Sequence, residues 1–176
     1  MTGQATGGRP GGAVGDVEVG AAGVGAGGLG LGEGGGSGPG EAERFVRRFA
    51  EVWAAPTPER LNTLVHPDVV FVQPIEPEVH GHAEAAAFWG RLFRLIPDLR
   101  GEIVSWGHRN GVVYIELRMS GTLGGRPIVW TTLDRIHLDA GKVRHRTANF
   151  DPLPLIRAIA MRPKALALFL LSRLLR

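Results

Sequence analysis

The sequence predicts an α+β domain in which helices pack on one face of a curved antiparallel sheet. Apolar residues recur at helical spacing as far as residue 96, whereas strand-like segments separated by glycine turns occupy residues 103–150. Helices first and a strand meander afterwards is the order typical of α+β folds.

Amino-acid composition divides the chain into three parts. Residues 1–40 hold 18 of the 27 glycines and no aromatic residue. This segment is predicted to be disordered, because it cannot bury enough apolar surface to offset the entropy of ordering it. Residues 41–151 are long enough for one domain with its own core. Residues 152–176 are expected to form a basic, apolar helical tail.

The net charge of +3 combines five basic residues and no acidic one in this tail, 14 of each sign in residues 41–151, and a net −2 in residues 1–40. A basic face for nucleic acid is therefore not expected on the domain. The absence of cysteine suits a reducing compartment. No signal peptide is evident, and the longest apolar run has only seven residues. We therefore expect a cytoplasmic protein.

The first half of the domain is predicted to contain three helices and one strand. Phe45, Phe49 and Trp53 share one side of an amphipathic helix that begins near Glu41 and ends before Pro56. The elements that follow, bounded by proline or glycine, are a short helix over 58–65, a strand over 68–73 and a helix over 82–95.

The second half is predicted to be a meander of four strands. Asn110-Gly111 is a strong hairpin signal between the first two strands. Gly124-Gly125 and Asp139-Ala140-Gly141 supply the next two turns. The strands are expected over 103–108, 112–120, 127–138 and 142–150.

Asp134 is a candidate acid/base residue. Strand alternation places it on the same face as Trp130 and Ile136, which is the more apolar face. A carboxylate buried without a partner has a raised pKa, and such groups cluster at functional sites. The alternative is a structural ion pair with a neighbouring arginine such as Arg118.

The last strand has two possible registers. One turns His145, Asn149 and Asp151 inward, where they would line the polar mouth of a pocket. The other turns Phe150 inward and leaves those polar groups in water. Alternation alone does not decide, although inward arginines at alternate positions would make the second register costly.

Other polar signals are weaker. His80-Gly81-His82 has the form of a metal-binding pair, but the glycine marks a turn that makes the rings diverge, and no third ligand is evident. Neither a metal nor a cofactor is expected. Trp89 and Trp130 are candidates for the wall of an apolar cavity.

The order of elements, the Pro-interrupted segment Gln73-Pro74-Ile75-Glu76-Pro77 and the final Ala-Gly-Lys turn resemble the nuclear transport factor 2-like superfamily. Within it the chain is most similar to the SnoaL-like proteins. The resemblance covers about residues 41–155. It implies a cone-shaped sheet open at one end, a homodimer through the sheet and a hydrophobic small-molecule ligand.

The resemblance to enzymes of that superfamily implies roles for particular positions. Asp134 matches the oxyanion-hole Asp of ketosteroid isomerase, but Gln73 stands where that enzyme has its catalytic Asp. Because the base is lost, ketosteroid isomerase chemistry is not expected. Asn149-Phe150-Asp151 matches a motif of limonene epoxide hydrolase, whereas Arg118-Met119-Ser120 has Ser where the hydrolase has Asp. In polyketide cyclases of the SnoaL group a late Asp acts as acid/base, which carries over to Asp151.

Two function classes stay open. One is a cofactor-free cyclase, isomerase or hydrolase that uses carboxylate chemistry in an apolar pocket, and the other is a non-catalytic binding or dimerisation module. For the enzyme we predict Asp151 and Asp134 as catalytic residues that reach one cavity. The predicted substrate-binding residues are Trp130, Asn149, His145, Gln73, Trp89 and Arg118.

The tail is interrupted by Pro163, and Ala165 to Leu171 is apolar on every side. Packing against the domain or a second subunit is favoured over a membrane surface. The reason is that Lys164 and Arg173 lie about 180° apart on a helix, whereas an interfacial helix gathers its cations on one face.

Overall fold

The computed structural model describes residues 39–174, so the predicted disorder of residues 1–40 lies almost wholly outside the described residues. Five helices and six strands are described in this range. The helices are α1 (Pro39–Ala54), α2 (Pro58–Asn62), α3 (Gly81–Leu95), α4 (Leu153–Ala160) and α5 (Pro163–Leu174). The strands are β1 (Val65–Val72), β2 (Val79–His80), β3 (Arg100–Arg109), β4 (Val112–Leu123), β5 (Arg126–Asp139) and β6 (Lys142–Asn149).

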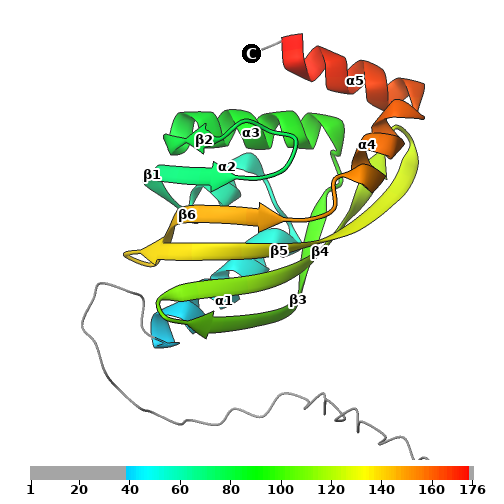
Figure 1. Cartoon of the computed structure of the whole chain (residues 1–176). Helices are drawn as coiled ribbons and strands as arrows, with labels where there is room; N and C mark the ends of the chain where they lie inside the picture. Colours follow the sequence, from blue (N-terminus) through cyan, green and yellow to red (C-terminus); the bar gives the residue numbers. More distant parts are fainter. Residues whose placement is uncertain (1–38, 175–176) are drawn as a thin grey trace, which may run out of the picture. The chain divides into compact units, whose positions relative to one another are not determined.

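The strands form one curved, unclosed sheet in the order β2-β1-β6-β5-β4-β3. Helices α1, α2 and α3 cover one face of it, and α4 and α5 lie at the end of the long strands β4 and β5 (Figure 1). The predicted α+β class and meander are confirmed. One strand pair differs from the antiparallel expectation, because β1 pairs with β6 in parallel.

Local sequence signals account for the ends of several elements. Thr57 caps α2, where its hydroxyl accepts a hydrogen bond of 3.2 Å from the backbone nitrogen of Arg60, and Pro58 occupies the first turn. In the β3–β4 hairpin Asn110 and Gly111 have φ angles of 51° and 75°. These left-handed conformations are the ones that an Asn-Gly turn supplies at low cost.

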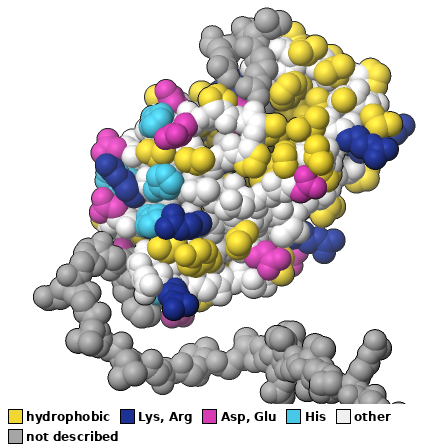
Figure 2. Space-filling view, in the orientation of Figure 1, with side chains coloured by type: hydrophobic (Ala, Val, Ile, Leu, Met, Phe, Trp, Pro, Cys, Tyr) yellow, Lys and Arg dark blue, Asp and Glu magenta, His cyan; other side chains and the backbone are white. Residues whose placement is uncertain are grey.

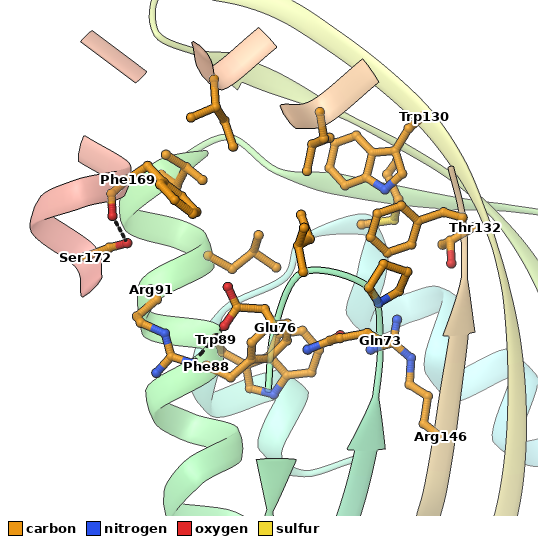
Figure 3. A pocket seen from close by; sticks show the side chains of 18 of the residues that line it. Gln73, Glu76, Phe88, Trp89, Arg91, Trp130, Thr132, Arg146, Phe169 and Ser172 are labelled. Carbon is orange, nitrogen blue, oxygen red and sulfur yellow. Dashed lines mark hydrogen bonds and ion pairs between the residues drawn. The ribbon is translucent and has the colours of Figure 1, made fainter. Parts of the chain in front are cut away.

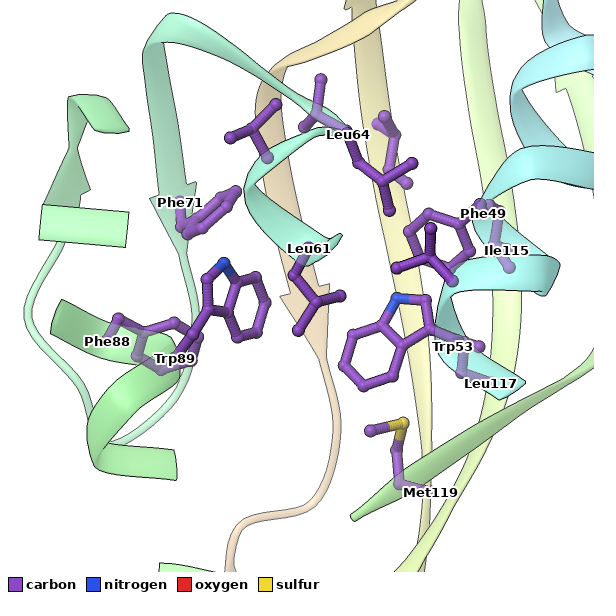
Figure 4. Close-up of a cluster of buried hydrophobic side chains, with 14 of the residues drawn as sticks. Phe49, Trp53, Leu61, Leu64, Phe71, Phe88, Trp89, Ile115, Leu117 and Met119 are labelled. Carbon is purple, nitrogen blue, oxygen red and sulfur yellow. The ribbon is translucent and has the colours of Figure 1, made fainter. Parts of the chain in front are cut away.

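The core between helices and sheet is strongly aromatic (Figure 4). Phe45, Phe49 and Trp53 are buried at successive turns of α1, as their spacing predicts. Trp53 meets Trp89 of α3 edge-on, with ring centroids 5.9 Å apart, and Phe71 of β1 meets Trp89 at 5.5 Å. Edge-to-face rings of this kind stabilise a core beyond the area they bury. Through Trp89, these contacts hold α1, α3 and β1 against one another.

A register shift in β6 decides which of its residues face inward. Leu138 pairs with Val143 and His137 with His145, so one residue of β6 has no partner between the two pairs. Such a bulge exchanges the two faces of a strand. Arg146 and Ala148 are therefore buried and Asn149 is exposed. The favoured prediction of inward His145, Asn149 and Asp151 is wrong.

The tail helices pack on the domain. Leu155 and Ile159 of α4 and Ala165 of α5 are buried in the hydrophobic core. Between them, the Arg162 guanidinium donates hydrogen bonds of 2.8 and 3.2 Å to the carbonyl oxygens of Leu123 and Arg126. Packing on the domain is thus the arrangement seen. None of the helices within residues 39–174 is long and apolar enough to cross a bilayer.

Candidate functional site

A cavity of about 110 Å³ lies between α3, the inner face of β5 and β6, and the tail helices. Figure 3 shows Trp130 and Thr132 of β5 on one side of it and Phe169 and Ser172 of α5 on the other. The segment after β1 contributes Gln73. The remaining lining is mostly apolar and comes from Trp53, Pro74, Ile75, Glu76, Phe88, Trp89, Arg91, Leu92, Leu95, Met119, Arg146, Phe150, Leu155 and Ile159.

Asp134 is buried behind this cavity and forms an ion pair with Arg146. The Arg146 Nε and Nη2 groups donate hydrogen bonds of 2.6 and 3.1 Å to its two carboxylate oxygens, and Thr132 Oγ1 donates a third of 3.1 Å. The side chain of Asp134 is 0% exposed and that of Arg146 is 11% exposed. Fork-like pairing of this kind fixes the guanidinium plane. Arg146 therefore presents a positioned cation to the cavity.

Two further polar groups enter the cavity from the segment after β1. The Gln73 Nε2 is buried and has no hydrogen-bond partner among the described residues. The Glu76 carboxylate accepts a hydrogen bond of 3.3 Å from Arg91 of α3, and both side chains are largely buried. An unpaired buried amide is costly and is stabilised by a ligand that supplies its partner. The site thus combines the donor groups of Gln73 and Arg146 with the Glu76 carboxylate.

Only part of the predicted site lies at the cavity. Gln73, Trp89 and Trp130 line it. Asp134 does not line the cavity but contacts Arg146, which does. The alternative prediction, a structural ion pair of Asp134 with an arginine, is the arrangement found, with Arg146 in place of Arg118.

Three predicted substrate-binding residues lie on the outer face of the sheet. Arg118 lines a separate surface hollow. Asn149 donates a hydrogen bond of 3.3 Å to the carbonyl oxygen of Leu133. The ring of His145 lies 6.1 Å from that of His137. Burial lowers the pKa of His137 below its ordinary value, and the charges of Arg135 and His145 lower it further.

Asp151 does not share the cavity with Asp134. Its side chain is exposed, and its Oδ1 accepts a hydrogen bond of 2.9 Å from the backbone nitrogen of Leu153 at the start of α4. It lines another surface hollow together with Arg157. The prediction that both carboxylates reach one cavity is therefore wrong. The bulge in β6 reverses the faces of the residues after it, so Asp151 is on the outer side.

Sequence reasoning missed five polar residues of the wall: Arg146, Glu76, Arg91, Thr132 and Ser172. Arg146 could have been predicted from Asp134, since a buried carboxylate requires a partner of opposite charge. Arg146 is on the strand next to that of Asp134. Glu76 gave no comparable signal, because it lies on an irregular segment between prolines.

The histidine pair does not form a metal centre. His80 Nε2 lies 3.4 Å from a carboxylate oxygen of Glu78. His82 Nε2 instead lies 3.0 Å from the carbonyl oxygen of Val65. Within residues 39–174, no three His, Asp or Glu side chains gather as metal ligands.

Comparison with known proteins supports the fold. The family model described as SnoaL-like domain matches residues 46–146. No curated protein matches the chain. A protein of Jannaschia sp. CCS1, named as a SnoaL-like polyketide cyclase, has a similar solved structure with a TM-score of 0.62 and 19% identity; the match covers 74% of this chain and 100% of that one.

Two further solved structures have different named activities or ligands. An LEH-like epoxide hydrolase of M. tuberculosis has a TM-score of 0.58 at 16% identity, covering 73% of this chain and 96% of the other. TerC, co-crystallised with polyporic acid, has a TM-score of 0.61 at 16% identity, covering 68% and 98%. At such identities the likeness extends to the fold alone. The family model spans more than half of the chain, and the chain belongs to the SnoaL-like family within the nuclear transport factor 2-like fold.

Proposed function

We propose that the chain is a cofactor-free enzyme that binds an apolar, ring-bearing small molecule with a carbonyl oxygen and moves a proton on it. The observation that carries this proposal is the buried Gln73 amide, which has no partner among the described residues and lies in an apolar wall near a carboxylate. A carbonyl oxygen of a ligand is one acceptor that suits such a donor.

Glu76 is the proposed acid/base residue. Its carboxylate would take a proton from the carbon next to the carbonyl group, so that negative charge develops on the carbonyl oxygen. Gln73 Nε2 and the cation of Arg146 would stabilise this enolate oxygen, since positioned donors act strongly at a site that excludes water. The same carboxyl group returns the proton to the ligand, and no cofactor takes part.

The volume of the cavity limits the ligand. The volume of about 110 Å³ is below the roughly 150 Å³ of a cavity that holds benzene in another protein, so a single ring is the upper limit for this arrangement of the wall. A larger ligand requires Phe169 of α5 to move. The co-crystallisation of TerC with polyporic acid supports the broader class of cyclic ligands for this fold.

Proton exchange provides the test. Cyclohexenone in D₂O, followed by NMR, is expected to exchange its α-hydrogens faster with the full chain than with buffer. Glu76→Gln should reduce the enzyme-dependent rate at least a hundredfold, as removal of a general base does. The matched control is Glu78→Gln, two residues along the same segment, where the side chain is exposed and outside the cavity. Equal loss in both variants would contradict the role of Glu76.

The other candidate function is a non-catalytic binding module. The observation in its favour is the ion pair of Glu76 with Arg91, which commits the carboxylate to a structural partner. A module would be stabilised by cyclohexenone more than by cyclohexene without any exchange of hydrogen. In that case Gln73→Leu should remove the difference between the two ligands.

The two residues predicted to be catalytic, Asp134 and Asp151, lie in different places, and neither lines the cavity. For Asp134 we propose a positioning role through Arg146, since it is buried behind the wall. Asp151 would act only on a ligand bound in the exposed hollow beside Arg157. If Asp151→Asn abolished the exchange, the reaction would belong to that hollow and not to the cavity.

We also propose a homodimer through the outer face of the sheet. Tyr114, Val129 and Leu133 are exposed there on β4 and β5, and the neighbouring residues carry both signs of charge. An apolar centre with a polar rim is the usual composition of an interface.

A further inference from the structure

The tail helices use only one side to pack on the domain. Leu155, Ile159 and Ala165 are buried, and Phe169 lines the cavity. A surface helix ordinarily presents polar residues on its other side. The outward side of this tail is apolar instead, with exposed Leu153, Ile156, Met161, Leu166, Leu168, Leu170 and Leu171. We call these seven side chains the tail surface.

The tail surface is well exposed. Leu153 and Met161 are each 68% exposed, and Leu170 and Leu171 are each 53% exposed. Figure 2 shows hydrophobic side chains gathered over the region of α4 and α5, with basic side chains at its edge. Scattered apolar residues are normal on a protein surface, but a continuous group of this kind marks an interaction site.

The charge of the tail indicates the partner. Residues 152–176 contain five basic residues and no acidic residue. Arg157 and Lys164 are exposed beside the tail surface, whereas Arg162 is engaged by backbone carbonyl oxygens. One carboxylate, that of Asp151, lies at the edge of the tail surface beside Arg157, so the charge of the surface and its surroundings is mainly positive. Apolar side chains with mainly positive charge complement anionic lipid headgroups and the acyl chains beneath them.

We propose that the tail surface docks on an anionic membrane surface. The leucines would enter the boundary between headgroups and acyl chains, and Arg157 and Lys164 would lie against the lipid phosphates. The helices would lie on the membrane, since none of those described is long enough to cross it. A second copy of the tail is a poorer partner, because two such surfaces would bring like charges together. This inference is independent of the reaction in the cavity.

Vesicle binding tests the proposal with the full chain. Co-sedimentation is expected with vesicles of phosphatidylcholine that contain phosphatidylglycerol, and it should be at least tenfold weaker with phosphatidylcholine alone. Leu170→Gln with Leu171→Gln should weaken binding about tenfold or more, since it removes buried apolar area from the complex. Circular dichroism should show an unchanged fold, because both side chains are outward.

A second pair of variants tests the charge. Arg157→Gln with Lys164→Gln should weaken binding to the anionic vesicles about tenfold at low salt. The matched control removes the same charge from exposed residues of α1 and β3, through Arg47→Gln with Arg109→Gln, and should stay within twofold of the unmodified chain. Failure of the unmodified chain to sediment with anionic vesicles would overturn the proposal. So would equal binding by the leucine variant, or self-association through the tail without vesicle binding.

Discussion

At the residue scale, the pair of Asp134 and Arg146 connects the fold to the candidate site. The sequence identified Asp134 as an inward carboxylate from strand alternation alone, and this part was correct. It could not identify the partner, because the face of Arg146 depends on a bulge that leaves no clear mark in the sequence. One extra residue in a strand reverses every side chain that follows. Because of the same shift, Asn149 and Asp151 face away from the cavity.

The pair makes a prediction for stability. Asp134→Leu should lower the free energy of unfolding by about 3–5 kcal/mol, because it leaves the Arg146 charge buried without a partner. The double variant Asp134→Leu with Arg146→Met should recover most of this loss, since an apolar pair of similar volume replaces both ions. Urea denaturation measures both. Equal stability of the single and double variants would show that the ions do not depend on each other.

At the element scale, proline and glycine positions predicted most boundaries, whereas contacts between elements could not be predicted. The Asn110-Gly111 hairpin and the Thr57 cap follow from local chemistry. The parallel pairing of β1 with β6 joins segments far apart in the sequence. For α5, packing on the domain does not exclude contact with a membrane, because one side of the helix packs on the domain and another side is exposed.

The contact between the tail and the β4–β5 turn predicts different effects at two adjacent glycines. Gly124 and Gly125 have φ angles of +58° and +82°, so alanine is strained at both. A Cβ at Gly124 would also approach the Ala165 backbone nitrogen to 3.1 Å, whereas nothing lies within 4 Å at Gly125. Gly124→Ala should therefore lower the melting temperature several degrees more than Gly125→Ala and expose the tail to limited proteolysis. Equal effects would contradict the packing of α5 on this turn.

The connection of α3 to β3 predicts a pH effect. Asp98 accepts hydrogen bonds of 2.7 Å each from the hydroxyl and backbone nitrogen of Thr122, which hold its pKa below the ordinary value of 3.8. A lowered folded-state pKa stabilises the fold above pH 3.8 and loses this effect as pH falls through the folded value. The stability advantage over Asp98→Asn should thus be present at pH 7 and disappear in acid. If the difference in stability between the two proteins did not change with pH, the lowered pKa of Asp98 would not be its cause.

At the scale of the whole molecule, the domain presents an inner cavity, an outer sheet face and an outward tail surface. The fold class and the SnoaL-like resemblance could be predicted because they depend on the order of elements. The location of the cavity wall could not, since it depends on how α5 packs against α3 and α4 and on the irregular segment 74–76.

The outer face makes a prediction for assembly. Leu133→Arg should shift the chain from dimer to monomer in light scattering, because it places a charge in the apolar centre of the proposed interface. Met161→Arg, on the tail surface, should leave the dimer intact. The reverse pattern would assign the dimer to the tail and also contradict membrane docking.

The central claim is that Gln73, Glu76 and Arg146 form one ligand site. The most direct test is a crystal structure of the full chain soaked with cyclohexenone. We predict that the ring lies between Trp130 and Phe169, with its oxygen within hydrogen-bond distance of Gln73 Nε2 or Arg146. A ring found in the exposed hollow at Asp151, with the cavity empty, would contradict the claim.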